Sequence, residues 1–105
     1  MIYNLNNFPK GWVIGHFPEA IIHSETTEVA IKRYKAGESE EYHMHKLADE
    51  ITIIVSGSAK MNGLIFRENE IILVRKGEYT NFEAITDVTT CVIKSPSVKD
   101  DKYFV

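Results

Sequence analysis

Short apolar and alternating segments, separated by turn residues, follow one another along the chain, and helical periodicity is nowhere convincing. A period of two is typical of β-strands, because successive side chains point to opposite faces of a sheet. The clearest strand is residues 51–55, which are rich in β-branched side chains. Further strands are expected at residues 12–15, 21–23, 28–35, 41–45, 59–61, 64–66, 70–74, 79–85 and 88–94. Many short strands separated by turns predict an all-β sandwich or barrel.

Turn residues refine this pattern at two places. Asn62-Gly63 lies between two apolar segments and predicts a two-residue β-hairpin, because a type I′ turn needs positive φ at both central positions. The Ser-Pro-Ser sequence at residues 95–97 ends the region of predicted strands. We expect the apolar residues 103–105 to pack on a surface of the protein.

Composition adds limits on function. The 105 residues are 44% apolar and 26% charged, which predicts one globular domain over residues 1–105. The net charge of −3, with scattered lysines and arginines, argues against a nucleic-acid partner. No apolar run approaches the roughly 18 residues of a membrane span, and no signal peptide is evident. The single cysteine, Cys91, excludes an intrachain disulfide, predicts a cytoplasmic protein and is expected to be a buried structural thiol.

Candidate chemistry is concentrated in the middle of the chain. His43 and His45 are two residues apart, so on an extended strand their imidazoles project from the same face. Glu50 follows after a short turn and can return to that face. Two imidazoles and a carboxylate suit a divalent transition metal, Fe, Mn, Ni or Zn, with positions left open for water or substrate.

The spacing of these residues is similar to a known motif. Gly37, His43, His45, Glu50 and Gly57 match the first motif of the cupin family at all five positions. The resemblance implies a double-stranded β-helix, or jelly-roll barrel, over about residues 28–94. It also implies a homodimer, since small cupins usually pair, and a small-molecule ligand.

The second cupin motif is only partly present. Its register places Asn69, Arg75, Gly77 and Thr80 at the motif positions, and only Gly77 matches. Thr80 stands where the family offers its fourth ligand, a histidine, and a threonine hydroxyl is a poor ligand for a transition metal. Thr80 could instead orient a metal-bound water. Glu41 shares strand parity with the two histidines, so it could face inward as a substitute ligand or a base.

Aromatic residues on neighbouring predicted strands could line a binding cavity. Tyr34, Tyr79 and Phe82 are the candidates, although aromatic side chains on barrel strands also serve as core.

The resemblance leaves three functions open. The first is a metal-dependent enzyme of the dioxygenase or isomerase type, acting on a sugar or carboxylate metabolite, with His43, His45 and Glu50 holding the metal. The second is a non-catalytic module that binds a small molecule or a metal. The third is a metal-free sugar-nucleotide isomerase or epimerase, with His43 or His45 as general base.

Overall fold

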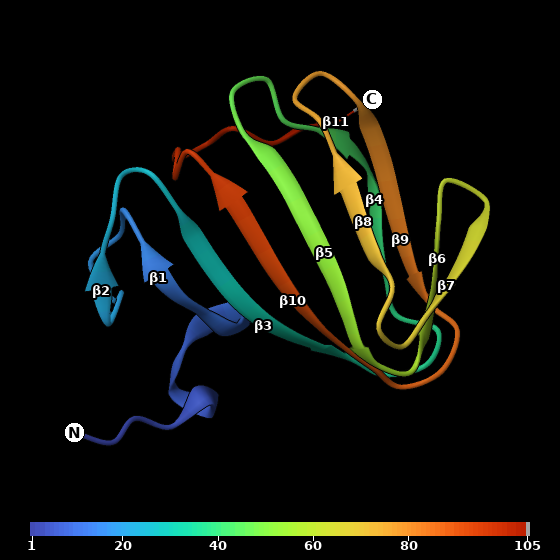
Figure 1. Cartoon of the computed structure of the whole chain (residues 1–105), viewed down its shortest axis with the longest axis horizontal. Helices are drawn as coiled ribbons and strands as arrows, with labels where there is room; N and C mark the ends of the chain where they lie inside the picture. The colour runs from blue at the N-terminus through green and yellow to red at the C-terminus, as the bar shows by residue number, and fades with distance from the viewer. Residues whose placement is uncertain (105) are drawn as a thin grey trace.

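Two β-sheets face each other in the computed structural model, which describes residues 1–104 (Figure 1). The first sheet has the order β2-β1-β3-β10-β5-β8. Its strands are β1 (Trp12–Gly15), β2 (Ile22–His23), β3 (Glu28–Tyr34), β5 (Asp49–Ser56), β8 (Ile71–Val74) and β10 (Val88–Ser95). The second sheet has the order β11-β4-β9-β6-β7. Its strands are β4 (Ser39–Met44), β6 (Ser58–Met61), β7 (Leu64–Arg67), β9 (Tyr79–Ala84) and β11 (Tyr103–Phe104).

The all-β prediction is confirmed, and every predicted strand is present. Two single-turn 3₁₀ helices, η1 (Leu5–Asn7) and η2 (Pro9–Gly11), precede β1. Strands β1 and β2 extend the first sheet beyond β3, as the blue and teal strands show (Figure 1). Within residues 1–104, no helix is long and apolar enough to cross a membrane.

The chain after β10 also joins the sheets. Tyr103 and Phe104 pair with Met44 and His43, so β11 becomes the edge strand beside β4. The expected packing of the apolar end is therefore found for these two residues, whereas Val105 lies outside the described residues.

The predicted hairpin is present between β6 and β7. Asn62 and Gly63 form its turn with φ of 50° and 80°, and Met61 pairs with Leu64. Asparagine and glycine are the residues that adopt positive φ at least cost, which explains why the turn forms here.

Apolar side chains from both sheets pack between them at one end of the molecule. Ile54 and Val88 are almost completely buried and come from the first sheet. Met61, Phe82 and Ala84 meet them from the second sheet. This cluster supplies the hydrophobic driving force that holds the two sheets together.

The two motif glycines, Gly37 and Gly57, are required for different reasons. Both have positive φ, +90° and +84°. A Cβ on Gly57 would lie 2.1 Å from the Asp87 carbonyl oxygen and 3.0 Å from the Val88 Cα. A Cβ on Gly37 would meet no atom within 4 Å. Gly57 therefore allows two backbone segments to approach each other, whereas Gly37 only allows a turn.

We predict that Gly57→Ala destabilises the fold far more than Gly37→Ala. The Gly37 variant incurs only the left-handed backbone cost of about 1–2 kcal/mol. The Gly57 variant must also displace backbone atoms, so its free energy of unfolding should fall by about 4 kcal/mol or more. Urea unfolding followed by circular dichroism measures both values. Equal losses would contradict the close approach at Gly57.

Candidate functional site

A cavity of about 1080 Å³ lies between the two sheets and is lined by charged, polar and aromatic side chains. This volume is large enough for a metabolite. Strands β3, β4, β5, β9 and β10 all contribute lining residues. Residues of the N-terminal segment and of the segment that follows β10 complete the wall.

Six of the eight predicted site residues line this cavity. They are His43, His45, Glu50, Thr80, Tyr34 and Phe82. His43 pairs with Thr80 across β4 and β9, so these two side chains lie on the same face of the sheet. The rings of Tyr34 and Phe82 are 4.6 Å apart between their centroids. The cavity thus brings these six residues together, and their roles are part of the proposed function.

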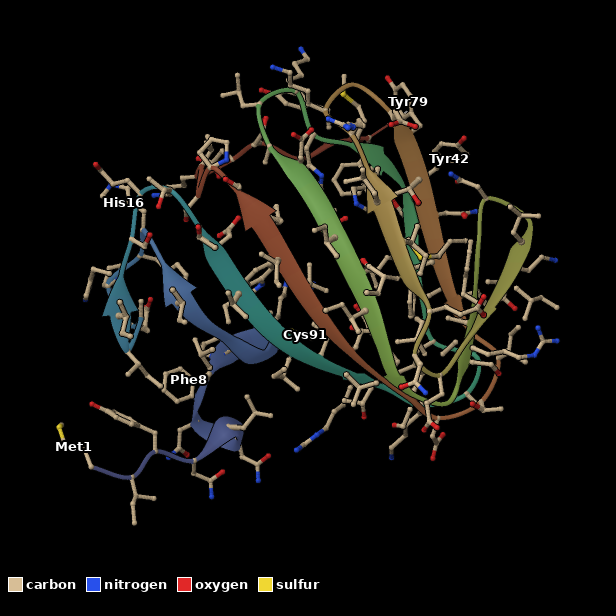
Figure 2. The ribbon with its side chains drawn as sticks, viewed as in Figure 1. Met1, Phe8, His16, Tyr42, Tyr79 and Cys91 are labelled. Atoms are coloured by element: carbon tan, nitrogen blue, oxygen red, sulfur yellow. The ribbon has the colours of Figure 1, made fainter. Side chains whose placement is uncertain are left out.

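The other two predicted site residues, Glu41 and Tyr79, do not line the cavity. Both are exposed, and the Tyr79 ring lies 5.7 Å from that of Tyr42 at the surface, where Figure 2 shows the two side by side. The expectation that parity turns Glu41 inward was wrong because β4 contains a bulge. Glu40 pairs with Phe82 and His43 with Thr80, so three steps on β4 match two on β9. Glu40 therefore faces the cavity in place of Glu41.

The two imidazoles are buried and close together. Only 6% of His43 and 4% of His45 is exposed, and their ring centroids are 5.3 Å apart with the rings nearly perpendicular. The Nδ1 of His43 lies 2.7 Å from the Glu41 carbonyl oxygen. A carbonyl can only accept, so Nδ1 carries the proton and Nε2 keeps its lone pair.

Burial also keeps both imidazoles neutral. It lowers the pKa of His43, although the hydrogen bond to the Glu41 carbonyl opposes this shift. Burial and then the nearby Lys94 charge lower the pKa of His45 to about 4. Near pH 7 both rings therefore present a nitrogen lone pair, which is the form that binds a metal or accepts a proton.

Glu50 lies on β5 at the same wall. Burial raises the pKa of its carboxyl, and the Lys94 and Lys32 charges oppose the shift. Lys94 is its direct cross-strand neighbour on β10. Among residues 1–104 the Glu50 carboxylate has no ion-pair partner within 4.0 Å, whereas Lys94 pairs with Glu28 at 3.3 Å. A partly buried carboxylate without a close partner is costly, and a bound cation would offset that cost.

The fit of these residues to a metal ion is therefore partial. The donor types suit a divalent transition metal, and a Nδ1–H bond to a carbonyl is how metal-binding histidines are commonly oriented. In the part of the chain that the structure describes, however, no three histidine, cysteine or acidic side chains are close enough to hold a metal. Binding would require a third group to approach the imidazole pair.

A network of charges and aromatic groups lies beside the imidazoles. Glu40 accepts a hydrogen bond of 2.6 Å from the Tyr34 hydroxyl and one of 3.2 Å from the Lys102 ammonium. Lys32 is 3.9 Å from the same carboxylate. Burial alone raises the pKa of Glu40, but Lys32, Tyr34 and Lys102 together lower it to about 2. Glu40 is therefore a fixed negative charge in the cavity wall.

A buried aspartate organises the loop between the two predicted ligands His45 and Glu50. The Asp101 side chain, 4% exposed, accepts hydrogen bonds of 3.0–3.2 Å from the backbone N–H groups of Lys46, Leu47 and Ala48. Three consecutive amides bound by one carboxylate hold this loop in a single conformation. The position of His45 relative to Glu50 thus depends on the chain after β10.

Lys32, Lys94 and Asp101 were not predicted from the sequence as residues of the site. Lys32 shares strand parity with the buried Ala30, which could have placed its side chain on the inner face. Lys94 shares parity with Val92 in the same way. For Asp101 the sequence offers no signal, because its partners are more than fifty positions away.

Comparison with known proteins gives structural but not sequence relatives. No family model matches the chain. No curated protein sequence matches it either.

Several solved structures have a similar fold. An RmlC-like cupin from Shewanella frigidimarina has a TM-score of 0.67 at 15% identity, covering 72% of this chain and 71% of its own. The DMSP lyase DddQ from Ruegeria pomeroyi has a TM-score of 0.74 at 15% identity, covering 90% of this chain and 49% of its own. Oxalate decarboxylase from Bacillus subtilis has a TM-score of 0.67 at 19% identity, covering 78% of this chain and 24% of its own.

At these identities the likeness concerns the fold alone. Combined with the two facing sheets and the cavity between them, it confirms the expected architecture. The chain has the double-stranded β-helix fold of the cupins.

Proposed function

We propose that this chain is a metal-binding cupin that acts, as a dioxygenase-type or isomerase-type enzyme, on a small polar metabolite such as a sugar or a carboxylate. The observation that carries the proposal is the orientation of His43. Its Nδ1–H bond to the Glu41 carbonyl leaves Nε2 unprotonated. The ring centroid of His43 lies 5.3 Å from that of His45, the second neutral imidazole. His43 and His45 would hold the metal, with Glu50 as the third ligand.

The chain's own residues would bind and orient the substrate. A bound divalent metal supplies Lewis-acid polarisation of a substrate oxygen, or redox chemistry if the metal is iron. Thr80 lies directly opposite His43, and its hydroxyl donates to the Asn81 carbonyl at 3.2 Å, so its oxygen can accept a hydrogen bond from water or substrate. Tyr34 and Phe82 form an aromatic wall against which an apolar part of the substrate can pack. The structures named above include a lyase and a decarboxylase, which shows that this fold carries enzymes.

A second candidate is a metal-free enzyme, and a specific observation favours it. Within residues 1–104 no three-ligand cluster is ready-made, and the neutral imidazoles can accept a proton through a nitrogen lone pair. In that reading His43 or His45 removes a proton from a sugar-nucleotide substrate. A module that binds without turnover has the same residues and differs only in lacking activity.

A homodimer is a separate proposal, supported by the outer face of the first sheet. Strand register aligns apolar side chains in two rows across β3, β10, β5 and β8. One row is Ile31, Cys91, Ile53 and Ile71, and the other is Val29, Ile93, Ile51 and Leu73. Such a grid is typical of a surface that associates. Cys91 is a partly buried member of this grid, and burial raises the pKa of its thiol. A cytoplasmic location of the protein is a further proposal, based on this single cysteine.

We predict that the purified protein binds about one divalent transition metal per chain and that His45→Ala weakens this binding at least tenfold. The protein is isolated without chelator, reconstituted separately with Fe, Mn, Ni and Zn, and measured by elemental analysis after gel filtration. His23→Ala is the matched control, because His23 is exposed and lies on β2. Absence of metal from the wild-type protein under all four conditions would contradict the metal proposal and favour the metal-free enzyme.

We also predict that replacing Ile71 and Leu73 together by lysine converts a dimer into a monomer. These side chains are 63% and 50% exposed, so the charges alter the surface and leave the core intact. Sedimentation equilibrium should give twice the chain mass of 12.0 kDa for the wild type and 12.0 kDa for the variant. Leu64→Lys, which is 63% exposed on β7 in the other sheet, should remain dimeric. A wild-type protein that is monomeric would refute the proposal.

A further inference from the structure

Lys32 places an incompletely paired ammonium group inside the cavity. Its side chain is only 17% exposed. The nearest carboxylate oxygen, on Glu40, is 3.9 Å away, which is too far for a hydrogen bond. That carboxylate already accepts shorter hydrogen bonds from Tyr34 and Lys102. Among residues 1–104, the Lys32 ammonium has no hydrogen-bond acceptor, although it carries three donors.

Two other lysines lie near this ammonium, together with the carboxylates of Glu40 and Glu50. Lys32 and Lys94 both lie over the Trp12 ring, at 5.2 Å and 5.5 Å from its centroid. Burial lowers the pKa of Lys32, Glu40 opposes the shift, and the charges of Lys102 and Lys94 lower the pKa further. Like charges in a partly buried site repel one another. Lys94 and Lys102 each have a carboxylate partner, at 3.3 Å and 3.2 Å, so a bound anion would serve mainly the free donors of Lys32.

An independent observation points to the same place. The Thr90 hydroxyl oxygen is buried without any hydrogen-bond partner, on a residue that is 1% exposed and lines the cavity. Thr90 is the direct cross-strand neighbour of Lys32, so their side chains share the inner face of the sheet. Because the hydroxyl is buried, a ligand can reach it only after a neighbouring side chain moves. The side chain of Lys32 is long and unbranched, so it can move aside. A buried hydroxyl without a hydrogen-bond partner is unusual, and a bound ligand would supply that partner.

We propose that Lys32 and Thr90 form a binding site for the carboxylate group of a small organic acid, with the Trp12 ring beside it. The ammonium would donate to one carboxylate oxygen and the hydroxyl to the other. We choose a carboxylate over a phosphate because the two donors, one ammonium and one hydroxyl, match its two oxygens. The assignment of this organic acid as the substrate rests on the function proposed above, whereas the binding of its carboxylate does not.

The proposal is tested by isothermal titration calorimetry of the purified protein with malonate, inorganic phosphate and malonamide, the uncharged diamide. Malonate should bind, and malonamide should not bind detectably. Lys32→Met should weaken malonate binding at least tenfold, because a hydrogen-bonded charge is lost. Lys60→Met is the matched control, since Lys60 is exposed on β6 and lies outside the cavity lining, and it should bind malonate like the wild type.

Thr90→Val separates binding from folding. If the hydroxyl serves a ligand, this variant should bind malonate about tenfold more weakly while its Tm stays equal or rises, because an unsatisfied buried hydroxyl has been removed. Unchanged malonate affinity in both Lys32→Met and Thr90→Val would overturn the proposal, as would absence of malonate binding. Phosphate binding tighter than malonate, with the same dependence on Lys32, would overturn the choice of a carboxylate. Malonate binding retained in His45→Ala would uphold this site even where the metal proposal fails.

Discussion

Burial of charge on the inner faces of two β-sheets is the constraint on which this site depends. An uncompensated charge between sheets costs several kcal/mol, so each charged group there must be neutralised, paired or provided with a ligand. Lys94 and Glu28 satisfy the constraint as a pair at 3.3 Å. The imidazoles of His43 and His45 satisfy it by remaining neutral. Lys32 and Glu50 satisfy it only partly, and both carry a proposed ligand for that reason.

The cavity therefore has two neighbouring regions of different chemistry. One contains the neutral imidazoles of His43 and His45 with Glu50 nearby, and it suits a metal or a proton transfer. The other contains the ammonium of Lys32 beside Trp12, and it suits an anion. If a metal is held by Glu50, that carboxylate no longer balances the lysine charges. The two regions then favour occupation together, by a metal and an anionic metabolite.

Positions in both regions depend on segments that are distant in sequence. The Asp101 carboxylate fixes the loop that follows His45, and the neighbouring Lys102 donates to Glu40 inside the cavity. Phe104 lies 6.4 Å from His43 between ring centroids. The segment after β10 thus forms part of the wall around the proposed metal site. Changes in this segment would alter the site without touching any motif residue.

Local patterns in the sequence were enough to predict the strands other than β11, the Asn62-Gly63 hairpin and the shared face of His43 and His45. These follow from backbone geometry, which acts between neighbours in the chain. Only the tertiary structure decided that Glu40 and not Glu41 enters the cavity, because the bulge in β4 depends on its pairing with β9. Lys32 and Thr90 likewise become neighbours through the pairing of two strands that are distant in sequence. The hydrogen bonds from the loop after His45 to Asp101 also join distant segments, and no local pattern encodes them.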